Sequence, residues 1–97
     1  MKWIEIIELR SGESSRELLE MQLQRFISQL DKEAIRHTIK IYNRVTLETD
    51  ISIHLYHESN KVEDSGSSLG IRLVSALNAH GLVNHTVWVE KPKYQNK

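Results

Sequence analysis

The stretch from Asp50 to Glu58 alternates between apolar and polar side chains along its whole length. Successive side chains of a β-strand point to opposite faces, so this alternation predicts a strand with two different faces. One face is apolar enough to lie in a core, and the other carries groups that could bind a partner or a ligand. The predicted core face consists of Ile51, Ile53, Leu55 and His57, and the other face of Ser52, His54, Tyr56 and Glu58.

Three further stretches alternate as strands do. Trp3 to Leu9 carries apolar side chains on both faces, which predicts a strand inside a sheet. Ile35 to Arg44 alternates strongly, and Leu82 to Glu90 alternates up to a stop at Pro92. The short connection from Val45 to Thr49 predicts an antiparallel hairpin between its two flanking strands.

Two other stretches repeat apolar residues at steps of three and four, the pattern of an amphipathic helix. The first is predicted to begin at Ser14, which forms a capping box with Glu17. The second is predicted to begin at Ser67 or the residue after it and to end at His80-Gly81. Their apolar stripes consist of Leu19, Leu23, Phe26, Ile27 and Leu30 in the first helix and Leu69, Leu73, Val74 and Leu77 in the second.

The elements follow one another in the order β-α-β-β-α-β. Two β-α-β units with right-handed crossovers give a four-stranded antiparallel sheet with both helices on one face, the ferredoxin-like plait. We therefore predict an α+β fold with the strand order 4-1-3-2. The 97 residues suit a single ferredoxin-like domain over residues 1–97, with residues 92–97 as a flexible tail.

The composition excludes several classes of function. The chain has 13 Lys and Arg and 13 Asp and Glu, whereas general nucleic-acid binders carry a clear basic excess. It has no cysteine, which excludes disulfides and thiolate metal sites and predicts a reducing, cytoplasmic location. No stretch reads as a signal peptide or a membrane span. We expect no cofactor and no membrane partner.

Two helices cover only one face of such a sheet, so the other is predicted to stay open. The first strand offers this face either Trp3, Glu5, Ile7 and Leu9 or Ile4, Ile6 and Glu8, and both registers put apolar groups there. A second copy of the chain, bound sheet to sheet around a two-fold axis, is the predicted cover. The alternative is that Trp3 and Trp88 pack together within one monomer. The predicted interface residues are Trp3, Tyr42, His54, Tyr56 and Trp88.

His54 and Tyr56 are the candidate catalytic residues. In a pocket between two sheets, His54 could act as a general base and Tyr56 as a proton donor. The predicted architecture resembles small plait proteins of the antibiotic-biosynthesis-monooxygenase type, which dimerise through their sheets and use an internal pocket. The resemblance implies a small-molecule ligand between paired sheets and assigns no residue roles. The alternative for His54 is a hydrogen bond within the interface.

A metal site and an RNA site are not predicted. His54 and His57 have metal-ligand spacing, but on a strand they point to opposite faces. RNA-recognition motifs are also plaits that stack bases on aromatic residues of the central strands. Here the third strand offers Tyr56 without the basic consensus of that motif, so nucleic acid is not an expected partner.

The loop from Ser65 to Gly70 precedes the second helix. Free amides at a helix start, together with small residues and hydroxyl groups, can hold a phosphate or a carboxylate. The alternative is that these residues only cap the helix. The candidate anion-binding residues are Ser65, Gly66, Ser67, Ser68 and Gly70.

Three hypotheses for the function follow. The first is a homodimeric interaction or binding module that uses the open face of its sheet and has no catalysis of its own. The second is a small-ligand enzyme or binding protein with its site between paired sheets, around His54, Tyr56 and Trp88. The third is an anion-responsive regulatory module that uses the loop from Ser65 to Gly70.

Overall fold

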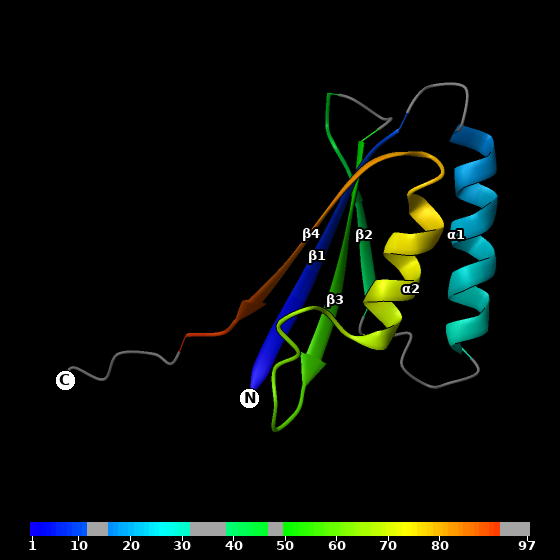
Figure 1. Cartoon of the computed structure of the whole chain (residues 1–97). Helices are drawn as coiled ribbons and strands as arrows, with labels where there is room; N and C mark the ends of the chain where they lie inside the picture. The colour runs from blue at the N-terminus through cyan, green and yellow to red at the C-terminus, as the bar shows by residue number, and fades with distance from the viewer. Residues whose placement is uncertain (12–15, 32–38, 47–49, 92–97) are drawn as a thin grey trace.

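A computed structural model describes residues 1–11, 16–31, 39–46 and 50–91 of the chain. The four strands form one antiparallel sheet in the order β2-β3-β1-β4, with β1 and β3 in the centre (Figure 1). The protein therefore has an α+β fold, and the strand order is the one expected from the sequence. The elements are β1 (Lys2–Ser11), α1 (Arg16–Asp31), β2 (Ile39–Asn43), β3 (Asp50–Glu58), α2 (Ser68–Leu77) and β4 (Gly81–Val89).

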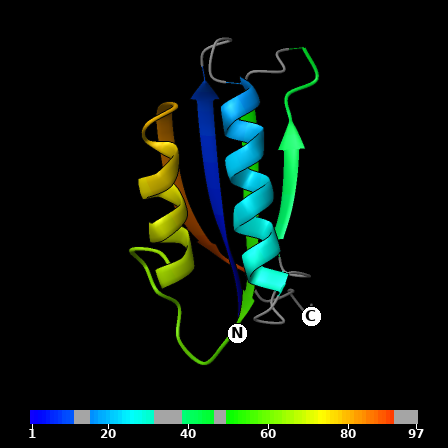
Figure 2. The same ribbon diagram turned by 90° about the vertical axis from the view of Figure 1, so that its right-hand side faces the viewer.

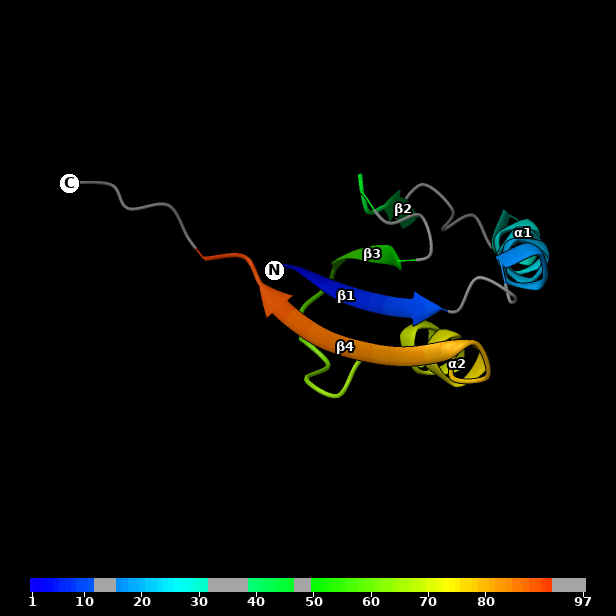
Figure 3. The ribbon, with the colours of Figure 1, turned by 90° about the horizontal axis from the view of Figure 1, so that it is seen from above.

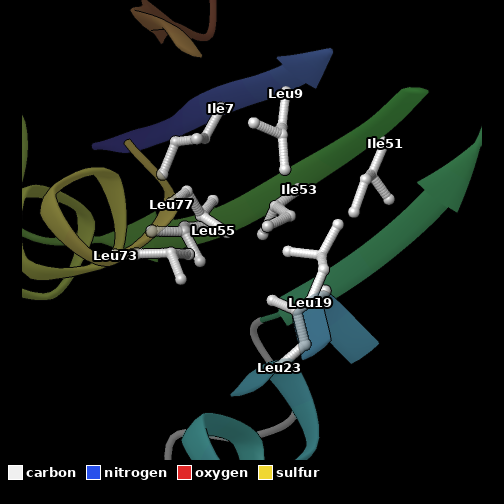
Figure 4. Close-up of a cluster of buried hydrophobic side chains, with 9 residues drawn as sticks. All are labelled: Ile7, Leu9, Leu19, Leu23, Ile51, Ile53, Leu55, Leu73 and Leu77. Atoms are coloured by element: carbon white, nitrogen blue, oxygen red, sulfur yellow. The ribbon is translucent and has the colours of Figure 1, made fainter. Parts of the chain in front are cut away.

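Both helices lie on the same face of the sheet, as Figures 2 and 3 show. α1 buries Leu19 and Leu23, and α2 buries Leu73 and Leu77. These side chains meet a layer of apolar groups from the two central strands (Figure 4). Among the described residues, no helix is both long enough and apolar enough to cross a membrane. The strand residues of the core are Ile7, Leu9, Ile51, Ile53 and Leu55.

The register of β1 decides which of its residues face the helices. Trp3 pairs with His57 of β3 and Val89 of β4, and the pairing continues without interruption to Arg10. The odd-numbered residues from Trp3 to Leu9 are buried on the helix side, and Ile4, Ile6 and Glu8 therefore belong to the opposite face. This corrects the expectation that Trp3 lies on the open face, because that expectation depended on a register the sequence left undecided.

The bounds of most elements agree closely with the sequence patterns. β3 has the predicted bounds, and Ser67 is the N-cap of α2, where its side chain accepts a hydrogen bond from the Gly70 amide. α2 ends at Leu77, before the predicted stop at His80-Gly81. Some predictions lie outside the described residues: the Ser14 cap, the start of the second strand within residues 32–38, part of the hairpin connection at residues 47–49, and the tail at residues 92–97.

Candidate functional site

Glu5 is a carboxylate in the middle of the hydrophobic side of the sheet. It lies on the central strand β1, between Leu55 of β3 and Val87 of β4, and its relative exposure is 0%. Burying an ionised carboxylate is costly unless its oxygen atoms find hydrogen-bond donors. The surroundings of Glu5 therefore decide whether this part of the fold is stable.

Four donors surround the Glu5 carboxylate. Oε1 accepts hydrogen bonds from the Ser67 amide at 3.1 Å and from His85 Nε2 at 2.8 Å. Oε2 accepts a hydrogen bond from His57 Nε2 at 2.6 Å and another from the Ser67 hydroxyl. A carboxylate offers about four lone-pair sites, so its acceptor capacity is filled. We call these four residues, Glu5, His57, Ser67 and His85, the Glu5 cluster.

The sheet register and the start of α2 bring the Glu5 cluster together. His57 pairs with Trp3 and His85 pairs with Ile7, so each ring lies diagonally across from Glu5 on a neighbouring strand. Diagonal neighbours of this kind are within reach of long side chains. Ser67 reaches the carboxylate from above the sheet because it caps the first turn of α2. Both central strands, one edge strand and one helix thus meet at a single charged group.

The hydrogen bonds keep Glu5 ionised. Burial alone would raise the pKa of Glu5, but the donors Ser67, His85 and His57 outweigh it and hold the pKa below its usual value of 4.5. An ionised carboxylate can only accept hydrogen bonds, so both imidazole rings carry a hydrogen atom on Nε2. Within the described part of the chain, the Nδ1 atoms of His57 and His85 have no hydrogen-bond partner. In a neutral ring, Nδ1 is the atom that can accept a proton.

Two glycines leave the space that the carboxylate occupies. A Cβ atom on Gly70 would lie 2.0 Å from Glu5 Oε1. A Cβ atom on Gly66 would lie 2.3 Å from His85 Cε1, and its φ of +102° also favours glycine. Within the loop from Ser65 to Gly70, Ser67 thus caps α2 and binds the chain's own Glu5 carboxylate.

A ring stack extends the Glu5 cluster to one end of the sheet. The Trp3 and His57 rings are stacked, with their centroids 4.1 Å apart and their planes 22° from parallel. Trp3 Nε1 donates a hydrogen bond to Ser59 Oγ at 3.0 Å, which holds the indole in place. Next to this stack is a surface hollow lined by Trp3, Tyr56, His57 and Trp88, among others. His57 therefore links the Glu5 cluster to this hollow.

The opposite side of the sheet carries most of the predicted interface residues. His54 lies between two tyrosines, with ring centroids 4.7 Å from Tyr42 and 6.3 Å from Tyr56. A hydrogen bond with Tyr42 raises the pKa of Tyr56 above its usual value of 10.0. Strand pairing places several further described residues on this open face, including Ile4, Ile6, Glu8, Lys40, Ser52, Leu82, Asn84, Thr86 and Trp88.

The structure separates the sequence candidates into two groups. His54, Tyr42 and Tyr56 form one cluster on β2 and β3, while Trp88 lies across β1 on the same open face, where its Nε1 donates to Thr86 Oγ1 at 2.8 Å. His54 Nε2 is 3.0 Å from Ser52 Oγ. Of the loop candidates, Ser67 binds Glu5. Gly66 and Gly70 leave space for the cluster, and Ser65 and Ser68 are exposed.

Sequence reasoning missed Glu5 and the roles of His57 and His85. The available signal was an acidic residue between Trp3 and Ile7 in a strand that is apolar on both faces. Among the residues that the structure describes, no group of three or more His, Cys, Asp or Glu side chains could hold a metal ion. A comparison with known protein families, curated proteins and solved structures found no match to this chain. The site must therefore be interpreted from its own geometry.

We predict that Gly70→Ala destabilises the protein by about 1–3 kcal/mol, because the new methyl group displaces the Glu5 carboxylate. At an ordinary helix position the same change would stabilise by about 1 kcal/mol. The measurement is urea denaturation of Gly70→Ala in the wild-type and the Glu5→Ala backgrounds. The matched control is Ser75→Ala on the exposed side of α2. If Gly70→Ala lowers the free energy of unfolding equally in both backgrounds, Gly70 is not needed to leave space for the Glu5 carboxylate.

We predict that Glu5→Gln lowers the free energy of unfolding at pH 7 by about 2–4 kcal/mol, because an amide cannot accept all four hydrogen bonds. The folded-state pKa of Glu5 is depressed, so its contribution is present above the unfolded value of 4.5 and is lost as the pH falls below it. The difference in unfolding free energy between Glu5→Gln and the wild type should therefore decrease as the pH falls from 5 to 3. Glu63→Gln, in an exposed loop position, is the control. A difference independent of pH would show that Glu5 is not ionised in the folded protein.

Proposed function

We propose that the protein is a homodimeric interaction module with a ferredoxin-like plait, in which two copies bind through the open face of the sheet. The order of the elements and the position of both helices on one face support the plait. A chain without cysteine suits a reducing compartment, and we place the protein in the cytoplasm on that basis. The proposal assigns no catalytic step to the open face.

The observation that carries this proposal is a set of three exposed aromatic rings on the open face. Tyr42, Tyr56 and Trp88 are 45%, 36% and 57% exposed, respectively. Between the rings, Ile4 and Ile6 give the centre of the face an apolar surface. Contiguous apolar and aromatic patches on small proteins commonly mark binding surfaces, and aromatic residues are enriched at the centres of interfaces.

The positions of two charges favour a second copy as the partner. The centre of the open face lies midway between His54 and Ile6, which pair directly. With about 4.8 Å between strands and about 3.3 Å per residue, the Cα atoms of Lys40 and Glu8 each lie about 7 Å from this centre. A two-fold axis in the plane of the interface that bisects the directions from the centre to Lys40 and Glu8 exchanges these two positions, because both are equally far from the centre. Lys40 of each copy can therefore lie opposite Glu8 of the other, which gives two identical ion pairs.

We predict that Glu8→Lys and Lys40→Glu each weaken self-association about tenfold, because like charges then face one another across the interface. The double variant Glu8→Lys/Lys40→Glu should recover wild-type affinity. The measurement is the mass and its concentration dependence in sedimentation equilibrium at low salt. Lys61→Glu, in the exposed loop after β3, is the control for a change of net charge. Weakening by both single variants without recovery in the double variant would contradict the reciprocal pairing.

A second candidate function is the binding of a small molecule, and the Glu5–His57 pair favours it. His57 is held by a carboxylate on one side and a tryptophan ring on the other, and it borders a hollow. A carboxylate-oriented imidazole with a free Nδ1 is suited to accept a hydrogen bond or a proton from a ligand. The version expected from the sequence, with His54 and Tyr56 in a pocket between paired sheets, requires the two open faces to leave a space between them.

The third candidate, an anion-responsive module at the loop from Ser65 to Gly70, has a built-in competitor. The Ser67 amide and hydroxyl already bind the Glu5 carboxylate, which an external anion would have to replace. This competition makes a neutral ligand at His57 the better-supported alternative to the dimer.

We predict that phenol, which has one ring and one hydroxyl donor, shifts the ring resonances of His57 at millimolar concentration. The measurement is a long-range proton–nitrogen NMR spectrum of the histidine rings during a phenol titration. His80 serves as the internal control, because it lies outside the hollow and pairs with Gln22 at 2.7 Å. Equal shifts at both rings, or none at His57, would argue against the ligand site.

A further inference from the structure

The two edges of the sheet differ in how they are protected against pairing with another strand. The described part of the β2 edge, Ile39–Asn43, includes Lys40 and is followed by Arg44. Charged side chains are a common protection of an exposed edge. The β4 edge runs for nine residues, from Gly81 to Val89, with no charged residue and no proline. No described element pairs with the outer side of β4, so its edge lacks these protections.

Strand pairing shows which backbone groups of β4 point outward. The Glu90 amide donates to the Lys2 carbonyl at 2.8 Å, so the even-numbered residues of β4 direct their backbone groups toward β1. The odd-numbered residues direct their amide and carbonyl groups away from the sheet. These outward-facing residues are Gly81, Val83, His85, Val87 and Val89.

We propose that β4 is a self-pairing edge, through which two copies join in antiparallel orientation about a two-fold axis at His85. In this register His85 lies opposite its own copy, Val83 opposite Val87, and Gly81 opposite Val89. Every outward-facing backbone group then meets another outward-facing group, as an antiparallel ladder requires. The result is one continuous sheet of eight strands. This interface goes beyond the proposed function, because it uses backbone groups of the edge rather than side chains of the open face.

Side chains are complementary in the same register. Leu82, which is 75% exposed, lies directly opposite Trp88 of the other copy on the open side of the sheet. The other cross-strand pairs are Val83 with Val87, Gly81 with Val89, Asn84 with Thr86, and His85 with its own copy. Apolar residues face apolar residues and polar residues face polar residues, and no like charges oppose each other. Direct cross-strand pairs of this kind stabilise antiparallel sheets.

Helix α2 contributes a second apolar group to this edge. The Arg72 guanidinium lies 6.0 Å from the Phe26 ring, which places the Arg72 side of α2 toward α1. Ile71 projects from the other side of α2 and is 50% exposed. α2 lies over β1 and β4, so the two-fold axis would bring both copies of α2 to within about 10 Å of each other, an ordinary helix-packing distance. Ile71 would then be covered by the second helix.

Engineered disulfides test the register directly, because the chain has no cysteine of its own. Leu82→Cys and Trp88→Cys are made separately, both in the Glu8→Lys background to weaken the open-face contact. Cα atoms of directly opposite residues lie about 4.5–5.5 Å apart, within the range of a disulfide. An equal mixture of the two variants should form a cross-linked dimer on oxidation. Either variant alone should not, because residues six positions out of register are about 20 Å apart.

Hydrogen exchange tests the same proposal without changing the edge. The amides of Val83, His85 and Val87 should exchange at least tenfold more slowly at millimolar than at micromolar concentration in the Glu8→Lys variant. Amides of the β2 edge, such as that of Lys40, should show no such change. Exchange at β4 that is independent of concentration, or cross-linking that is equal in the single variants and the mixture, would overturn the proposal. Its failure would leave the open-face interface untouched, because that contact is tested by the charge exchange between Glu8 and Lys40.

Discussion

The Glu5 carboxylate is the interaction on which the arrangement of sheet and helix depends. It accepts hydrogen bonds from β3, from β4 and twice from the cap of α2. Hydrogen bonds to a charged group contribute about 1.5–3 kcal/mol each, and a buried carboxylate without partners costs several kcal/mol. If the sheet and the start of α2 separate, this charge is therefore either exposed to solvent or left without hydrogen-bond donors. Gly66 and Gly70 belong to the same constraint, because any side chain there would occupy the space of the carboxylate or of His85.

Periodicity alone predicted much of the fold. The alternation from Asp50 to Glu58 gave the bounds of β3, the cap at Ser67 gave the start of α2, and the order of elements gave the strand order. The Glu5 cluster was not predictable in this way, because β1 is apolar on both faces and its register was open. Its donors also lie 52, 62 and 80 residues further along the chain. The loop before α2 was considered as a site for an external anion, but local sequence could not reveal that Ser67 binds the chain's own Glu5 carboxylate.

The two sides of the sheet differ in how far their side chains are satisfied within one molecule. On the helix side all four hydrogen bonds to the Glu5 carboxylate come from within the chain. On the open face the aromatic rings remain partly exposed, and at the outer edge of β4 the backbone groups face outward. The groups that we propose for association are thus separated from those that maintain the fold. Tyr56 and Leu82 lie outside the core that contains Leu55 and Leu73.

The central position of β1 also has a consequence for how the molecule folds. β1 forms ladders only with β3 and β4, and its contacts span most of the chain, as the 80-residue separation of Glu5 and His85 illustrates. Non-local contacts of this kind raise the contact order. A high contact order slows folding, because the entropy cost of closing long loops precedes the stabilisation that the contacts provide. During synthesis β1 can pair with β3 before β4 has been made, but its other edge stays unpaired until then. This interval is when the chain is most open to misassociation.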